Sequence, residues 1–283
     1  MESNQGPTVR RYMLGRRLRA LRDQAGMTAV QAAQHLDVTQ PTITRIEKGR
    51  NAILVRNVKQ LCQLYRVGAP LLDTLVRLAR ESDGLDWFAV YGDTVPDWFG
   101  VFAAFEADAA EILSYEAENV PGLLQVPSYI RGITAAGKSG VTEEELQQSV
   151  DFRTGRQQRL TDDPPVLRYV LNEAVVRRQV GGPDGMRAQL EHLIDMSRKP
   201  YVTLQVLPFA AGPHPAQAGP FVMLRLPDEP SPNFVYLEHD HGALYQERPA
   251  DLERYGSVFA QLTEMALSPD DTRELLASLV SGS

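Results

Sequence analysis

Four polar side chains in one short segment have the types and the spacing needed to read DNA bases. The pattern of apolar residues predicts two short helices joined by a tight turn, over residues 28–36 and 39–48. The second helix would present four side chains outward: Gln40, Thr42, Thr44 and Arg45. Glutamine pairs with adenine and arginine with guanine through two hydrogen bonds, and threonine donates to bases or phosphates. We therefore expect this helix to enter the major groove of double-stranded DNA.

A second set of side chains around this segment has the charge and the hydroxyl groups needed to contact phosphates. The helix predicted over residues 10–25 has one leucine face, and its arginines, Arg22 among them, are expected on the remaining surface. The expected phosphate contacts are Arg16, Arg17, Thr39, Lys48, Arg50 and Arg56. Such contacts hold a protein in position on a duplex but do not specify its sequence.

Other patterns that could indicate chemistry are few. Residues 238–241 (Glu-His-Asp-His) have ligand-type side chains that His214 could join, but they lack the spaced second pair of a structural zinc site. We interpret this run as a solvated loop and expect no metal. Cys62, the only cysteine, follows Leu61 on the apolar face of a helix and is expected to be a core residue. No Gly-x-Ser-x-Gly, Walker or Rossmann pattern occurs, so we expect neither an enzyme nor a bound cofactor.

Five polar residues in the second part of the chain are candidates for contact with a ligand or a partner: Gln125, Glu173, Gln205, Tyr236 and Glu238. Most of them stand on predicted strands or at strand ends. In one interpretation they converge on a single pocket or interface. In the other they are internal hydrogen-bonding groups, and both interpretations stay open. Residues 120–125 likewise fit either a buried turn or an exposed docking loop.

The positive charge of the chain is concentrated at its beginning. The 283 residues have a formal net charge of −7, but residues 1–80 hold 14 Lys and Arg against 5 Asp and Glu. The remaining residues hold 15 basic and 31 acidic side chains, so the two parts carry net charges of +9 and −16. A basic module joined to an acidic one indicates that only the first contacts nucleic acid.

The sequence also predicts where the protein resides. A single cysteine fits a reducing compartment, and neither a membrane-spanning apolar run nor a secretory signal is found. We therefore expect a cytoplasmic protein that is nucleoid-associated when bound to DNA and makes no contact with membranes.

The expected elements divide the chain into three parts. Residues 1–82 are predicted to form a five-helix helix-turn-helix domain, residues 83–105 an aromatic-rich hinge, and residues 106–283 a mixed α+β domain. The fold class is therefore mainly α with α+β. In the last part, strands are expected over residues 110–120, 166–171, 201–207, 221–226 and 233–238, and helices over residues 142–160, 183–198, 250–267 and 269–280.

Residues 27–49, which contain the small Ala33 and end in Glu-Lys-Gly, resemble the XRE/Cro-type helix-turn-helix family. Two positions depart from its pattern. The turn residue, usually glycine, is Asp37, which tolerates a left-handed backbone at a modest cost. The glutamine that is common near the start of the motif is replaced by Ala29. The resemblance implies a DNA-binding regulator, and we expect a homodimer, because one such unit reads only a short half-site.

The rest of the chain is similar to a group of actinobacterial regulators in which an XRE-type domain is joined to a C-terminal domain without an established activity. The similarity includes residues 120–125 (Val-Pro-Gly-Leu-Leu-Gln), 202–208 and 235–238. It implies a transcription regulator whose second domain receives a small-molecule effector or a partner protein. In the alternative, the chain is the antitoxin-like member of a two-protein system that binds a small acidic partner and autoregulates its operon.

Overall fold

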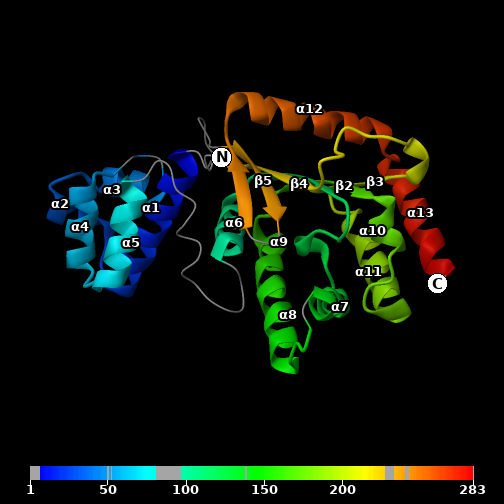
Figure 1. The fold of residues 1–283 in the computed structure, drawn as a ribbon, viewed down its shortest axis with the longest axis horizontal. Coiled ribbons are helices and arrows are strands. Elements are labelled where there is room, and N and C mark those ends of the chain that lie inside the picture. Colours follow the sequence, from blue (N-terminus) through cyan, green and yellow to red (C-terminus); the bar gives the residue numbers. More distant parts are fainter. Residues whose placement is uncertain are drawn as a thin grey trace. The chain divides into compact units, whose positions relative to one another are not determined.

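The computed structural model describes residues 7–49, 51, 53–80, 97–137, 139–226, 233–239 and 242–282. The chain divides into two compact units, which comprise residues 1–101 with 244–248 and residues 102–243 with 249–283. Most of the aromatic hinge expected over residues 83–105 lies outside the described residues, and its last part belongs to the helix α6 (Asp97–Asp108). The predicted fold class is confirmed, because a helical N-terminal region precedes a mixed α+β domain (Figure 1).

The described part of the first unit contains the five helices that the sequence predicts before residue 82. They are α1 (Pro7–Gln24), α2 (Ala29–Leu36), α3 (Gln40–Glu47), α4 (Val55–Leu64) and α5 (Ala69–Arg80). Their apolar faces meet in one core that includes Leu18, Ile43 and Leu61. Cys62 is buried in this core, and burial raises the pKa of its thiol to about 11. The thiol is therefore neutral at physiological pH and packs as a small apolar side chain.

The second unit is built on strands β1 to β5 of a six-stranded sheet with the order β3-β2-β1-β4-β5-β6. The strands are β1 (Glu111–Glu116), β2 (Val166–Asn172), β3 (Val202–Leu207), β4 (Phe221–Arg225), β5 (Asn233–His239) and β6 (Gly242–Gln246). β1, β2 and β3 are parallel, whereas β4 runs antiparallel to both β1 and β5. The sheet is therefore mixed, and β1 and β5 run in the same direction on either side of β4.

Helices cover both faces of this sheet (Figure 1). They are α7 (Pro127–Gly137), α8 (Glu143–Gln157), α9 (Arg159–Asp162), α10 (Glu173–Arg177), α11 (Gly182–Met196), α12 (Pro249–Met265) and α13 (Pro269–Ser281). On one face, Phe259 and Leu262 of α12 pack against Leu113 and Phe221 of the strands. On the other face lie α6, α8 and α11, and Phe105 of α6 packs against Phe234.

The structure of the second part of the chain differs from the sequence expectation at two points and decides between two alternatives at a third. β6, α7 and α10 were not expected, and β1 ends at Glu116 although strand-like alternation continues to residue 120. Residues 120–125 form a buried turn around a short 3₁₀ helix, Gly122–Leu124, so the exposed docking loop is excluded.

Among the described residues, no helix is long and apolar enough to cross a membrane.

Candidate nucleic-acid interface

The turn between α2 and α3 is set by local interactions that the sequence encodes. The Thr28 hydroxyl accepts a hydrogen bond from the Gln31 backbone N–H at 3.2 Å, and the Gln31 side chain accepts one from the Thr28 N–H at 2.8 Å. This capping box fixes where α2 begins. Asp37 ends α2 in a left-handed conformation with φ 54°, at the turn position where glycine is usual. Pro41 stands in the first turn of α3, where a missing N–H costs nothing.

One side of α3 is anchored in the core of the first unit. Ile43 and Ile46 are buried together with Glu47 at its last position. Gly15 of α1 lies against this end of α3, and a Cβ atom at that position would overlap the Ile46 carbonyl oxygen. The backbones of the two helices therefore approach so closely that only glycine fits at position 15.

A buried ion pair joins the same two helices. The guanidinium of Arg22 donates to both carboxylate oxygens of Glu47 at 2.6 and 2.9 Å, and to the Met27 carbonyl oxygen at 2.7 Å. Arg22 is 9% exposed and Glu47 is 6% exposed. The hydrogen bond to Glu47 raises the pKa of Arg22, so the guanidinium is charged at physiological pH. This corrects the expectation that Arg22 lies on the outer surface of α1 with the other arginines.

The four predicted base-reading residues lie on the part of α3 that the core leaves uncovered. Gln40 and Arg45 are exposed, and Thr42 and Thr44 are half-buried. The Thr44 hydroxyl donates to the Gln40 carbonyl oxygen at 3.2 Å, and the Thr42 hydroxyl is 2.9 Å from that of Thr39. The two long side chains are therefore better placed to reach a base edge than the two threonines, whose hydroxyls have partners within the helix.

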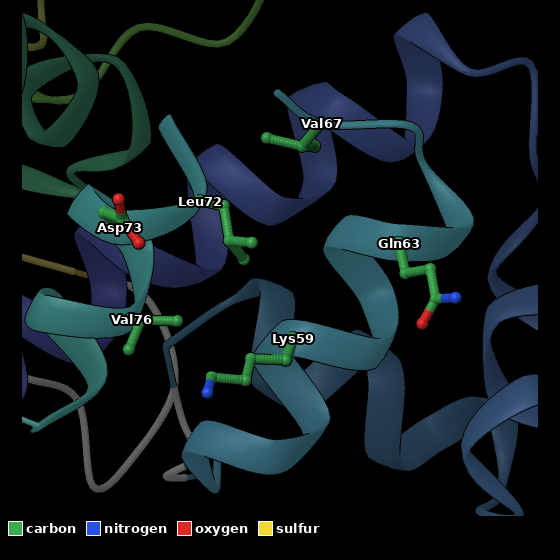
Figure 2. A pocket seen from close by; sticks show the side chains of 6 residues that line it. All are labelled: Lys59, Gln63, Val67, Leu72, Asp73 and Val76. Atoms are coloured by element: carbon green, nitrogen blue, oxygen red, sulfur yellow. The ribbon is translucent and has the colours of Figure 1, made fainter. Parts of the chain in front are cut away.

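Most of the predicted phosphate contacts lie on the surface of the first unit. Arg17, Thr39, Lys48 and Arg56 are exposed, and Arg16 is half-buried. Arg50 lies outside the described residues. A groove of about 470 Å³ between α4 and α5 is a separate feature of this unit, lined by Lys59, Gln63, Val67, Leu72, Asp73 and Val76 (Figure 2). No residue predicted to contact DNA lines this groove.

Three of the five ligand or partner candidates use their side chains on the backbone of their own unit. The Gln125 amide donates to the Val120 carbonyl oxygen at 2.7 Å. The Gln205 amide donates to the carbonyl oxygens of Thr263 and Leu267 at 3.2 and 2.8 Å. Glu173 accepts from the Phe209 N–H at 2.6 Å and also pairs with Arg177, and these contacts hold its pKa below the usual range although burial opposes them.

The other two candidates, Tyr236 and Glu238, come together on β5, where the tyrosine hydroxyl donates to the carboxylate at 3.2 Å. Gln205 lies on the opposite face of the sheet, because its register partner Val170 packs with the α12 core. The five candidates therefore do not form one pocket. Among the described residues, no group of three or more His, Cys, Asp or Glu is arranged to hold a metal ion. His214 lies beside the Tyr115 hydroxyl, 3.3 Å from it, and positions 240 and 241 are outside the described residues.

Two comparisons with protein families match the two parts of the chain. The model of a family described as a helix-turn-helix domain matches residues 13–75, which contain α2, the turn and α3. The model of a family described as a domain of unknown function (DUF5753) matches residues 99–278, well over half of the chain. The chain belongs to the DUF5753 family. The DUF5753 match covers the whole six-stranded sheet. The helix-turn-helix match indicates that the N-terminal region binds DNA. No curated protein and no solved structure matches the chain.

Sequence reasoning missed two groups of polar residues. The first is the Arg22–Glu47 pair, although Glu47 is the only acidic residue within α3 and stands two residues before Gly49, which has φ 69°. The second is on β1, where Ser114 and Glu116 alternate with the buried Leu113 and Tyr115. Polar residues at alternate positions of an otherwise apolar strand were the available signal.

Proposed function

We propose that the protein is a sequence-specific transcriptional regulator that acts as a homodimer, with α3 as its reading helix. The observation that carries this proposal is the division of α3 into two sides. Ile43, Ile46 and Glu47 anchor one side in the core, and the other side presents Gln40 and Arg45. A helix held rigidly by its neighbours with long hydrogen-bonding side chains on its free side is suited to the major groove.

The surrounding charge supports the same proposal. Arg17, Lys48 and Arg56 are exposed on the unit that contains α3, and residues 1–80 have a net charge of +9. Contacts from such residues to phosphates supply affinity for any duplex, and base contacts then add the preference for one sequence. Because a single reading helix spans only a few base pairs, two copies on neighbouring half-sites would give a useful specificity.

We propose a receiving role for the DUF5753 region, which would convert a signal into a change in DNA binding. Residues 81–283 have a net charge of −16, so this region is repelled by phosphate and has its surface available for another partner. Its six-stranded sheet with helices on both faces is large enough to enclose a ligand.

Selection from a random duplex library tests the proposed function directly. The full chain is expected to enrich one motif, with two inverted half-sites whose centres are about one helical turn, or a multiple of it, apart. A library bound at physiological salt but enriched for no motif would show a general DNA-binding protein instead. Enrichment of a single unrepeated half-site would contradict the homodimer.

A further inference from the structure

One face of the sheet carries two matched pairs of a hydroxyl and a carboxylate. On β1, the Ser114 hydroxyl donates to Glu116 at 2.7 Å, and on β5 the Tyr236 hydroxyl donates to Glu238 at 3.2 Å. In each pair the residues are two apart on a strand, so their side chains lie on the same face. The two strands flank β4, and the register places Ser114 and Tyr236 in one row, on either side of Val222.

The two carboxylates fall in the next row of the sheet. Continuing the register, by one residue beyond the last β1–β4 pair and by two beyond the last β4–β5 pair, places Glu116 and Glu238 on either side of Pro220. Neighbouring strands are about 4.8 Å apart, so the two Cα atoms are about 10 Å apart and one small molecule can contact both side chains. Among the described residues, neither carboxylate has an ion pair with Lys, Arg or His. Burial, together with the charge of Glu238, raises the pKa of Glu116 to about 7.

An arginine of α8 faces this row without a partner of its own. Arg153 is half-buried and close enough for the charge of Glu238 to act on it, yet it has no hydrogen bond or ion pair within the described part of the chain. Burial lowers the pKa of Arg153, as does the neighbouring charge of Arg156. Arg156 differs, because it donates to both oxygens of Glu106 at 2.9 and 2.8 Å. Arg153 is therefore a positive charge near this row that no side chain of the described residues pairs.

A buried tyrosine on the neighbouring strand lacks a partner as well. Tyr169 of β2 is 3% exposed and stands opposite Ser114 in the register, so it belongs to the same face. Its hydroxyl has no hydrogen bond to any described residue, although the charges of Glu106, Glu116 and Arg156 act on it. A tyrosine hydroxyl without a partner among the described residues, on the same face as Glu116 and close enough for its charge to act on it, is available to hydrogen-bond a ligand at this face.

We propose that this face of the sheet binds a small zwitterionic molecule, whose protonated amine pairs with Glu116 and whose anionic group pairs with Arg153. The Tyr169 hydroxyl supplies a further hydrogen bond. A ligand with both charges neutralises the two unpaired groups together and adds no net charge to the site, whereas an ion of one sign would neutralise only one of them. The role of this ligand as the signal of a regulator rests on the proposed function, but its binding can be measured without DNA.

Isothermal titration calorimetry of the full chain at pH 8 tests the site. The probes are 4-aminobutyrate and the common α-amino acids, with butylamine and butyrate as controls that each carry one of the two charges. At least one zwitterion is expected to give saturable heat, and the two controls none. If no zwitterion binds, or if butylamine or butyrate binds as well as the zwitterions, the proposal is overturned.

Two variants and their matched controls locate the binding. Glu116→Gln and Arg153→Gln should each weaken binding by about tenfold or more, because each removes a charge-assisted hydrogen bond. Glu191→Gln and Arg187→Gln, both exposed on α11, should leave it unchanged. Equal binding by all four variants would contradict the site. Thermal unfolding without ligand separates a binding role from a structural one, because a structural residue lowers the melting temperature when replaced. If these binding experiments overturned the ligand site, the proposal that α3 reads the DNA sequence would not be affected.

Discussion

Glu47 is the residue whose surroundings are most informative about the first unit. It ends α3, and its carboxylate is buried against Arg22 of α1. Replacing Arg22 with alanine would leave this carboxylate buried and unpaired, which costs about 3–5 kcal/mol of the free energy of unfolding. Urea unfolding of Arg22→Ala should show this loss.

Arg19→Ala is the matched control, because Arg19 is about half exposed on the same helix and contacts Asp23 at 3.8 Å. Loss of such a surface pair costs about 1 kcal/mol or less. The double variant Arg22→Met with Glu47→Leu removes both charges and should recover most of the loss. If Arg22→Ala were no more destabilising than Arg19→Ala, the pair would not anchor α3.

Glu116 gives the second unit a dependence on pH that can be measured. Its folded pKa of about 7 is above the ordinary value of 4.5, so the folded state holds the proton more tightly than the unfolded state. The contribution of the protonated Glu116 carboxyl to the free energy of unfolding is complete below pH 4.5 and is lost as the pH rises through 7. At pH 8, the free energy of unfolding of Glu116→Gln should therefore exceed that of the wild type by about 3 kcal/mol, and at pH 4.5 the two values should be nearly equal.

The titrating neighbours of Glu116 make this prediction specific. Glu238 of β5, Tyr169 of β2 and Tyr129 of α7 are coupled to it electrostatically, and its own strand contributes only the Ser114 hydroxyl. Urea unfolding of the wild type and Glu116→Gln at both pH values is the measurement. A difference in stability that does not change with pH would show that the carboxyl is not the titrating group.

The residue pattern predicted which side of α3 and which face of α1 lie in the core, but it did not predict the role of every residue on α1. The period of Leu14, Leu18 and Leu21 marks the buried face, and all three are buried. The same period places Arg22 beside that face without indicating whether it turns inward. Its partner Glu47 is 25 residues away, so the pair depends on tertiary packing that local sequence does not encode.

At the scale of elements, the close approach of α1 and α3 can be tested with one methyl group. Gly15→Ala would force the helices apart and should destabilise the protein by about 1–3 kcal/mol, although alanine is the better helix former. Gly256→Ala on α12 is the control, because no atom lies within 4 Å of a Cβ there. That change should stabilise by about 0.5–1 kcal/mol. Stabilisation by both changes would show that α1 and α3 are not in tight contact.

Element positions were predictable where the pattern was long or capped. The capping boxes at Thr28 and Thr142 mark the beginnings of α2 and α8, and the alternating strands appear close to their expected bounds. β6 was missed because it follows β5 so closely that the two sequences run together. α10 was missed because its five residues begin directly after β2, at the Asn172 cap. Short elements of this kind are specified by their contacts more than by their own periodicity.

At the scale of the whole molecule, the division of charge predicts which part binds DNA. Residues 1–82 alone should shift a duplex in a gel at moderate salt, and residues 83–283 alone should not, because their charges have opposite signs. Circular dichroism of each fragment shows whether it is folded. A shift produced by the folded C-terminal fragment would contradict the assignment.

The central claim is that α3 reads the DNA sequence. Its most direct test is the ratio of affinities for the selected duplex and a scrambled one, measured by fluorescence anisotropy for Gln40→Ala, Arg45→Ala and the wild type. Each change should lower that ratio by about tenfold, because a bidentate base contact contributes about 1–3 kcal/mol of discrimination. Gln63→Ala and Lys59→Ala on α4 should leave the ratio at the wild-type value. An unchanged ratio in both α3 variants would show that another element reads the DNA.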